Sequence, residues 1–96
     1  MSISMEELLE KMQNERLNII DIRSSNKYEI SHIPNSINIP SSLLITNPSK
    51  YLDKDKIYYL YCNSGYISND VSTMLNHIGY NTKNIIGGYN YYLLIK

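Results

Sequence analysis

The stretch from Ile57 to Ser68 restricts the possible folds more than any other, and it holds the only cysteine of the chain. An apolar, aromatic run, Ile57–Tyr61, ends at Cys62; a short polar loop with Gly65 follows, and helical periodicity begins after it. This order predicts a buried strand, a tight loop and a helix N-terminus. In parallel sheets, ligands bind beyond the carboxyl ends of strands, and helix N-termini offer unpaired N–H groups. We therefore expect Cys62 to lie where a thiolate is favoured.

Length and charge exclude several classes of protein. With 96 residues we expect a single domain, residues 1–96, and the formal net charge of +0 without like-charge runs argues against nucleic-acid or membrane-surface partners. No basic, apolar leader and no membrane-spanning run is visible, so we expect a cytoplasmic location. One cysteine can form neither an internal disulfide nor a thiolate-rich metal site.

The first part of the chain alternates helix and strand. Residues 4–15 are predicted to be a helix, because Ser4 and Glu7 have the spacing of a capping box and apolar residues follow at helical intervals. The β-branched run at residues 17–22 predicts a strand that ends near Asp21.

The next segment is polar and then extended. Residues 23–33 predict one or two helical turns after an Asn26 cap, with Tyr28 and Ile30 as apolar anchors. Residues 36–39 alternate polar and apolar side chains, as a short strand does.

The second half continues this alternation. Residues 41–56 predict a short helix and a turn around Pro48, residues 82–86 a strand, and residues 89–95 a terminal helix. The helix after the cysteine loop has an apolar stripe and ends at Gly79. Its stripe consists of Ile67, Val71, Met74, Leu75 and Ile78. The order predicts an α/β fold with a mainly parallel sheet of about five short strands and helices on both faces.

Three blocks of the chain share a further pattern. The first block contains Asp21-Ile-Arg23, Tyr28-Glu29 and His32–Pro40. The second is Cys62–Ser68, and the third is Ile86-Gly87-Gly88 followed by Tyr92. In order and separation they resemble the signatures of the rhodanese-like sulfurtransferase domain in its small single-domain form. Those signatures are D-x-R followed by G-H-I-x-G-A-x-N-I-P, the loop C-x-x-G-x-R-S, and G-G-x-x-x-W.

The resemblance implies a fold and a reaction. Cys62 would be the nucleophile that takes sulfane sulfur from thiosulfate or a persulfide donor and passes it to a thiol or cyanide. The partners would be a small sulfur-containing anion or persulfide and a thiol acceptor, which could be a protein; no cofactor and no metal is implied. The loop that would hold the sulfur consists of Asn63, Ser64, Gly65, Tyr66, Ile67 and Ser68. The structural motif residues are Asp21, Arg23, Glu29, His32, Gly87 and Gly88.

This chain departs from the family pattern in several places. Ser31 and Asn35 replace two glycines, and Asn tolerates the left-handed backbone that the second would adopt. Tyr92 replaces a tryptophan. Ile67 stands at the position of the loop arginine. We therefore expect weak activity with thiosulfate, because the loop lacks the cation that would attract this anion. We interpret Ile67 itself as a packing residue that begins the helical stripe.

Other interpretations remain open. A rhodanese-like module without turnover could bind a protein partner through the loop face, and the missing arginine favours this. Phosphatase or arsenate-reductase chemistry would suffer more from that loss, because phosphoryl transfer depends on charge neutralisation. His32 is interpreted as a structural residue of the turn. Asp21 and Arg23 are interpreted as strand-end and ion-pair residues, with Glu29 as a candidate partner of Arg23.

Overall fold

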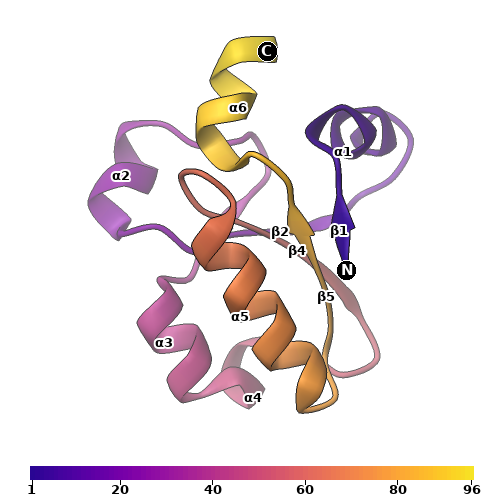
Figure 1. Ribbon diagram of the computed structural model, residues 1–96, viewed down its shortest axis with the longest axis vertical. Helices are drawn as coiled ribbons and strands as arrows, with labels where there is room; N and C mark the ends of the chain where they lie inside the picture. The colour runs from indigo at the N-terminus through magenta and orange to yellow at the C-terminus, as the bar shows by residue number, and fades with distance from the viewer.

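The computed structural model describes residues 1–96 and contains one five-stranded sheet in which all strands are parallel. The strand order is β1-β5-β4-β2-β3, and Figure 1 labels all of these strands except β3. The strands are β1 (Ser2–Ile3), β2 (Asn18–Asp21), β3 (Ile37–Asn38), β4 (Ile57–Tyr61) and β5 (Asn81–Ile85). The helices are α1 (Met5–Met12), α2 (Ser25–Ile30), α3 (Ser41–Thr46), α4 (Pro48–Tyr51), α5 (Tyr66–His77) and α6 (Gly88–Ile95). The predicted α/β fold is confirmed, and β1 is a strand that the sequence pattern did not indicate.

The central strand β4 separates two hydrophobic cores, because its side chains alternate between the faces of the sheet. Tyr58, Leu60 and Cys62 face the core beneath α3, α4 and α5, which lie in front of the sheet in Figure 1. Tyr59 and Tyr61 face the other core, which contains residues of α1 and α6. Cys62 therefore emerges from the strand on the side that α5 covers.

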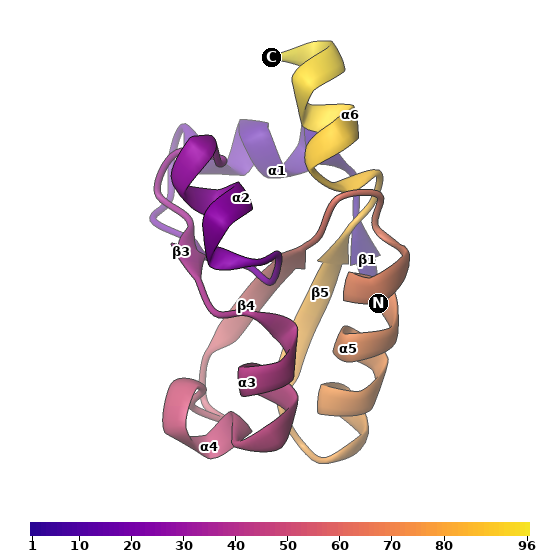
Figure 2. The same ribbon diagram turned by 90° about the vertical axis from the view of Figure 1, so that its left-hand side faces the viewer.

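The strands point their carboxyl ends toward one end of the molecule. Figure 2 shows α6 and the loop between β4 and α5 at this end, with α3 and α4 at the other. Asp21 pairs with Tyr61 in the register of β2 and β4, so these two strands end side by side. Leu60 pairs with Asn84 of β5, which ends one residue further on. The loops after β2, β4 and β5 are thus neighbours.

Local sequence signals explain several of the element boundaries. The Ser4 side chain accepts a 3.0 Å hydrogen bond from the Glu7 N–H, so the predicted cap of α1 is confirmed. Asn35 has a φ of 71°, which confirms the left-handed backbone expected there. The cap of α2 is Ser24, not Asn26, because the Ser24 hydroxyl accepts from Lys27 N–H.

Several predicted core positions are wrong. Ile30 is 84% exposed at the end of α2, a helix that buries none of its residues, so it anchors nothing. Tyr28 is fixed instead by a 2.5 Å hydrogen bond from its hydroxyl to the Ser36 carbonyl oxygen. In α5 only Val71 and Leu75 of the expected stripe are buried, because the sheet covers a narrower strip of this helix than the pattern suggests.

No helix of the structure has both the length and the apolar character that a membrane crossing needs.

Candidate active site

The only cysteine lies directly after the end of β4, and its side chain is 5% exposed. The loop Cys62–Gly65 turns the chain from β4 into α5. Asn63 is half-buried, Ser64 is exposed and Gly65 is buried. Gly65 adopts a φ of 96°, a left-handed conformation that glycine accepts without a steric penalty. The loop can therefore close tightly over the sulfur.

The Cys62 sulfur is surrounded by hydrogen-bonding groups of this loop. The backbone N–H groups of Gly65 and Ser68 donate to Sγ at 3.2 and 3.3 Å. The Ser68 Oγ lies 3.2 Å from the same sulfur. Three groups from the loop and the first turn of α5 thus converge on one atom. Backbone N–H groups that curl around one point form a binding site for an anion.

These contacts favour the thiolate over the thiol. Burial raises the pKa of Cys62, but the hydroxyl and N–H of Ser68 and the N–H groups of Gly65 and Ser64 lower this pKa by more. The pKa of Cys62 therefore lies below its ordinary value. A thiolate is the nucleophilic form of cysteine, so the site activates the sulfur without a nearby cation.

A second glycine turn supports the cysteine loop from the side of α6. Gly88 and Gly87 have φ values of 60° and 85°. A Cβ atom on Gly88 would lie 2.5 Å from the Cys62 carbonyl oxygen and 2.7 Å from that of Asn63, and one on Gly65 would lie 2.9 Å from the Gly87 nitrogen. The two loops can approach each other only because these positions have no side chain.

The approach aligns the loop with the start of α6. The N–H of Tyr89 donates to the Cys62 carbonyl oxygen at 2.8 Å, and that of Asn90 donates to the Asn63 carbonyl oxygen at 2.9 Å. The loop carbonyls are therefore turned toward α6, while loop N–H groups face the sulfur. The third sequence block thus contributes to the site by holding the cysteine loop.

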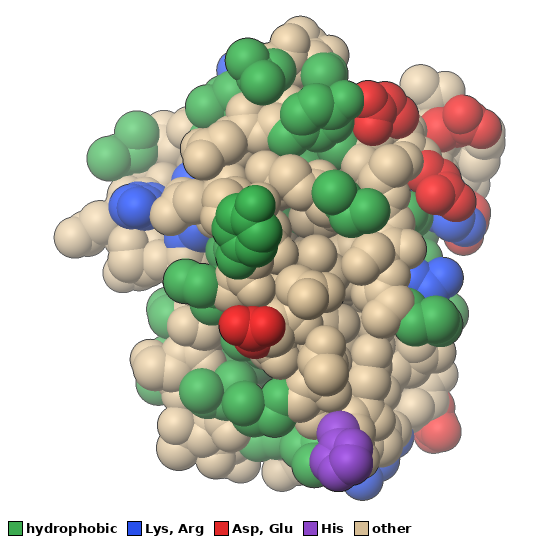
Figure 3. Space-filling view, in the orientation of Figure 1, with side chains coloured by type: hydrophobic (Ala, Val, Ile, Leu, Met, Phe, Trp, Pro, Cys, Tyr) green, Lys and Arg blue, Asp and Glu red, His purple; other side chains and the backbone are tan.

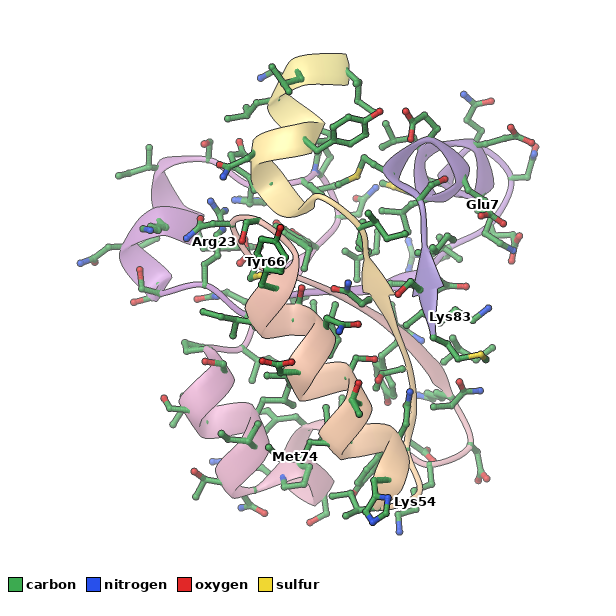
Figure 4. The ribbon with its side chains drawn as sticks, viewed as in Figure 1. Glu7, Arg23, Lys54, Tyr66, Met74 and Lys83 are labelled. Atoms are coloured by element: carbon green, nitrogen blue, oxygen red, sulfur yellow. The ribbon has the colours of Figure 1, made fainter.

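The two residues after Gly65 point outward. Tyr66 is 79% exposed and stands on the outside of the first turn of α5 (Figure 4), and Ile67 is 60% exposed. The interpretation of Ile67 as a packing residue is wrong, because Ile67 lies on the outer side of the first turn of α5, whose inner side carries the fully buried Ser68. Hydrophobic side chains gather over α6 and the start of α5 on the face shown in Figure 3. No cation is present at the position where the family has its arginine.

The Asp21–Arg23 motif forms a buried ion pair beside this site. The Arg23 Nη2 lies 2.7 Å from Asp21 Oδ2, and Nε lies 3.0 Å from both carboxylate oxygens. Burial lowers the pKa of Arg23, but the Asp21 carboxylate raises it by more, so the guanidinium stays charged. The candidate pairing of Arg23 with Glu29 is wrong. Arg23 pairs instead with Asp21, two residues earlier in the chain, while Glu29 is exposed and forms no ion pair.

The remaining contacts of Arg23 fix the chain after α2. Its Nη2 donates to the Ser31 carbonyl oxygen at 2.7 Å, and its guanidinium lies 4.2 Å from the centre of the Tyr89 ring. His32 stacks on Tyr28 with ring centres 3.8 Å apart, and its Nδ1 is 2.7 Å from the Tyr28 carbonyl oxygen. These residues brace the turn and do not contact the sulfur.

The sequence pattern missed one residue of this site. The Ser68 hydroxyl lies 2.5 Å from Oδ1 of Asn84, which is buried in β5. Asn84 precedes the Gly87-Gly88 turn by three residues and had no distinguishing signal except a polar side chain within the predicted strand at residues 82–86.

The fold and the site define a class: an α/β domain with a hydrogen-bonded cysteine beyond the carboxyl end of its central strand. The family model of the rhodanese-like domain matches residues 4–94, and the chain belongs to this family. The resemblance seen in the three sequence blocks is thereby confirmed.

Relatives of the chain include proteins named as sulfurtransferases. The tRNA sulfurtransferase of Thermoplasma acidophilum is 43% identical over 61 residues, which are 64% of this chain but 12% of that longer protein. YtwF of Bacillus subtilis, which is provisionally named a sulfurtransferase, is 36% identical over 87 residues, or 90% of this chain and 84% of YtwF. The solved structure of SSP1007 from Staphylococcus saprophyticus has a TM-score of 0.87 and 30% identity, and the match covers 95% of this chain and 91% of that one.

Proposed function

We propose that the protein is a sulfurtransferase or persulfide carrier whose nucleophile is Cys62. The observation that carries this proposal is the convergence of the Gly65 and Ser68 N–H groups and the Ser68 hydroxyl on a single buried sulfur. The same groups that favour the thiolate would also favour an anionic persulfide, because both place negative charge on sulfur inside the loop. The sulfurtransferase names of the relatives support the reaction class.

The reaction would proceed in two steps. In the first, the Cys62 thiolate attacks the sulfane sulfur of a donor, the new S–S bond forms, and the donor's bond to that sulfur breaks; from thiosulfate the leaving group is sulfite. In the second, an acceptor thiolate or cyanide attacks the terminal sulfur and releases the Cys62 thiolate. The product is a new persulfide or thiocyanate, and neither step needs an external oxidant or reductant.

The exposed apolar residue at position 67 would shift the preference among donors. Thiosulfate is an anion that gains from a cation at the mouth of the loop, and Ile67 offers it neither charge nor a hydrogen bond. A persulfide donor with less charge depends less on such a cation. We therefore propose low activity with thiosulfate and better activity with a persulfide. Residues 1–96 would act as one domain, and a cytoplasmic location would suit the single reduced cysteine.

The test is intact mass spectrometry after incubation with thiosulfate and, separately, with a persulfide donor. A gain of one sulfur that is absent in Cys62→Ser supports the proposal. Cys62→Ser is a suitable control because serine keeps the size and polarity of the side chain. No adduct from either donor, with the protein folded, would contradict it.

A second candidate function is a binding module without turnover. The exposure of Tyr66 and Ile67 at the mouth of the loop favours it, because both present apolar surface to a partner. The same mass experiment separates the two functions: a module without turnover forms no persulfide at Cys62.

A further inference from the structure

The Ser68 hydroxyl lies between the reactive sulfur and a buried amide. Its oxygen is 3.2 Å from Cys62 Sγ and 2.5 Å from Asn84 Oδ1. Ser68 is fully buried and Asn84 is 5% exposed. The backbone of Asn84 is fixed on both sides, since β5 pairs with β4 and β1 at this residue. The three side chains therefore form a chain of hydrogen bonds that is largely closed to water.

A hydroxyl has one hydrogen, so it can donate in only one direction. With Cys62 as a thiol, S–H donates to the Ser68 oxygen and the Ser68 O–H donates to Asn84 Oδ1. When the thiol proton passes to solvent, the sulfur becomes an acceptor only. The Ser68 O–H then has two competing acceptors, the thiolate and the amide oxygen.

The Asn84 amide can resolve this competition. An Asn side chain carries both a donor and an acceptor, and a half-turn about its last bond exchanges them. With Nδ2 toward Ser68, the amide donates to the serine oxygen and leaves the serine hydrogen for the thiolate. The only side-chain hydrogen bond of Asn84 in the structure is the one that Oδ1 accepts, so no hydrogen bond of Nδ2 opposes this half-turn.

We propose that Asn84 is a positioning residue whose side-chain amide sets the direction of the Ser68 hydrogen bond. The Ser68 hydrogen then points toward Asn84 when Cys62 is a thiol and toward the sulfur when Cys62 is a thiolate. The proposal rests on the proposed function in that the thiolate is the reacting form. Asn84 does not touch the sulfur and acts only through Ser68.

The charged side chains around Cys62 lie outside this chain of hydrogen bonds. Asp21 and Arg23 at the end of β2 pair with each other, and Asp70 of α5 is exposed. Lys83 of β5 lies near β1, away from the start of α5 (Figure 4). The other titratable groups on the adjoining elements are His77 at the far end of α5 and tyrosine hydroxyls: Tyr58, Tyr59 and Tyr61 of β4, Tyr66 of α5, and Tyr89, Tyr91 and Tyr92 of α6. A change in the titration of Cys62 upon substitution of Asn84 would therefore come through Ser68 or from the new charge itself.

The test measures the protonation of Cys62 directly, by the pH dependence of its alkylation by iodoacetamide. Asn84→Asp places a carboxylate, which can only accept, beside Ser68, and we expect the midpoint to rise by about one unit or more. Asn69→Asp is the matched control, because it adds the same charge one residue from Ser68 at an exposed position; we expect a shift below about half a unit.

A double-mutant cycle separates the hydrogen bond from the charge. In a Ser68→Ala background, Asn84→Asp should raise the midpoint by clearly less than it does with Ser68 present. An equal rise in both backgrounds, or no rise with Ser68 present, overturns the proposal. Alkylation needs no sulfur donor, so a protein that fails in sulfur transfer can still pass this test.

A second measurement uses the unaltered protein and so does not depend on whether the Asn84 variants fold. The side-chain amide signals of Asn84 in a nitrogen–proton NMR spectrum should shift with pH at the midpoint of Cys62 alkylation and stay constant in Cys62→Ser. If the chemical shifts of the Asn84 side-chain amide do not change as Cys62 titrates in the unaltered protein, the proposal is overturned.

Discussion

The carbonyl oxygen of Cys62 accepts a 2.8 Å hydrogen bond from the backbone N–H of Tyr89, so the residue that we propose as the nucleophile also caps the first turn of α6. This contact joins the loops after β4 and β5. It depends on Gly88, because a Cβ atom at this position would lie 2.5 Å from that same carbonyl oxygen. The geometry of the cysteine loop is therefore determined jointly by residues 26 positions apart in the sequence.

Gly88→Ala should destabilise the protein and distort the loop. The new Cβ would lie 2.5 Å from the Cys62 oxygen at a φ of 60°. We expect a loss of about 3 kcal/mol in the free energy of unfolding, from overpacking and left-handed backbone together. Urea denaturation followed by circular dichroism measures it.

Gly79→Ala is the matched control for this prediction. It has a φ of 103°, but its Cβ would meet only the flexible end of Lys54, at 3.2 Å. A loss of about 1 kcal/mol is expected from the backbone alone. Equal losses at the two glycines would show that the contact with Cys62 is not tight.

Ile67→Arg should raise the rate of sulfur transfer from thiosulfate to cyanide. The side chain at position 67 is 60% exposed at the mouth of the loop, so an arginine there can reach an anionic donor without disturbing the core. We expect a gain of about tenfold, equivalent to one charge-assisted hydrogen bond. Thiocyanate formation measures the rate.

Ile78→Arg controls for the added charge. Ile78 is also half-exposed, but it follows the last turn of α5, at the opposite end from the loop. This variant should match the parent protein. If Ile67→Arg were no faster than Ile78→Arg, the proposal that the missing cation limits activity with thiosulfate would be wrong.

Arg23→Ala should destabilise the protein strongly, because it leaves the fully buried Asp21 carboxylate without its partner. Removing one member of a buried ion pair costs about 3–5 kcal/mol. Lys11→Ala, which breaks the exposed pair with Glu15, should cost about 0.5 kcal/mol or less. The urea denaturation midpoints of the two variants measure the stability lost on breaking each ion pair. Similar midpoints would contradict the inference that the Asp21–Arg23 pair is important for stability.

The stability of the protein should depend on pH through Cys62. Burial raises the pKa of this thiol, the hydrogen bonds of Ser68, Gly65 and Ser64 lower it by more, and the folded pKa lies below the ordinary value of 9.0. Between these two values the unfolded chain binds more protons, so the free energy of unfolding rises with pH. The contribution is complete above the ordinary value and is lost as the pH falls through the folded pKa.

Comparison with Cys62→Ser isolates this contribution. The difference in unfolding free energy, parent minus variant, should grow as the pH rises toward 9.5 in urea denaturation experiments. A difference that shrinks over this range would mean that the folded protein prefers the thiol.

Much of the fold follows from patterns that are local in sequence. The helix cap at Ser4, the apolar run of β4 and the left-handed Asn35 each depend on neighbouring residues, and the structure agrees with all three. The boundaries of β5 differ by one residue from those expected, and the two-residue β1 was not predicted. A strand this short has too little hydrophobic pattern to be recognised.

The predicted environments failed where exposure depends on distant parts of the chain. Ile30 and Ile67 both fit helical apolar patterns, yet both face solvent: α2 buries none of its residues, and Ile67 lies on the outer side of the first turn of α5. The partner of Arg23 was likewise a matter of geometry: the bend after β2 turns its guanidinium back onto Asp21 rather than toward Glu29.

By itself the sequence determined the order of strands and helices apart from β1 and α4, the family of the domain and the position of the cysteine between β4 and α5. Each of these depends on residue types at fixed spacing along the chain. Only the tertiary structure decided which groups surround the sulfur and that Ser68 connects it to Asn84. Those contacts join β4, α5 and β5, and the spacing of residues along one chain does not specify which side chains meet when the sheet brings separate strands together.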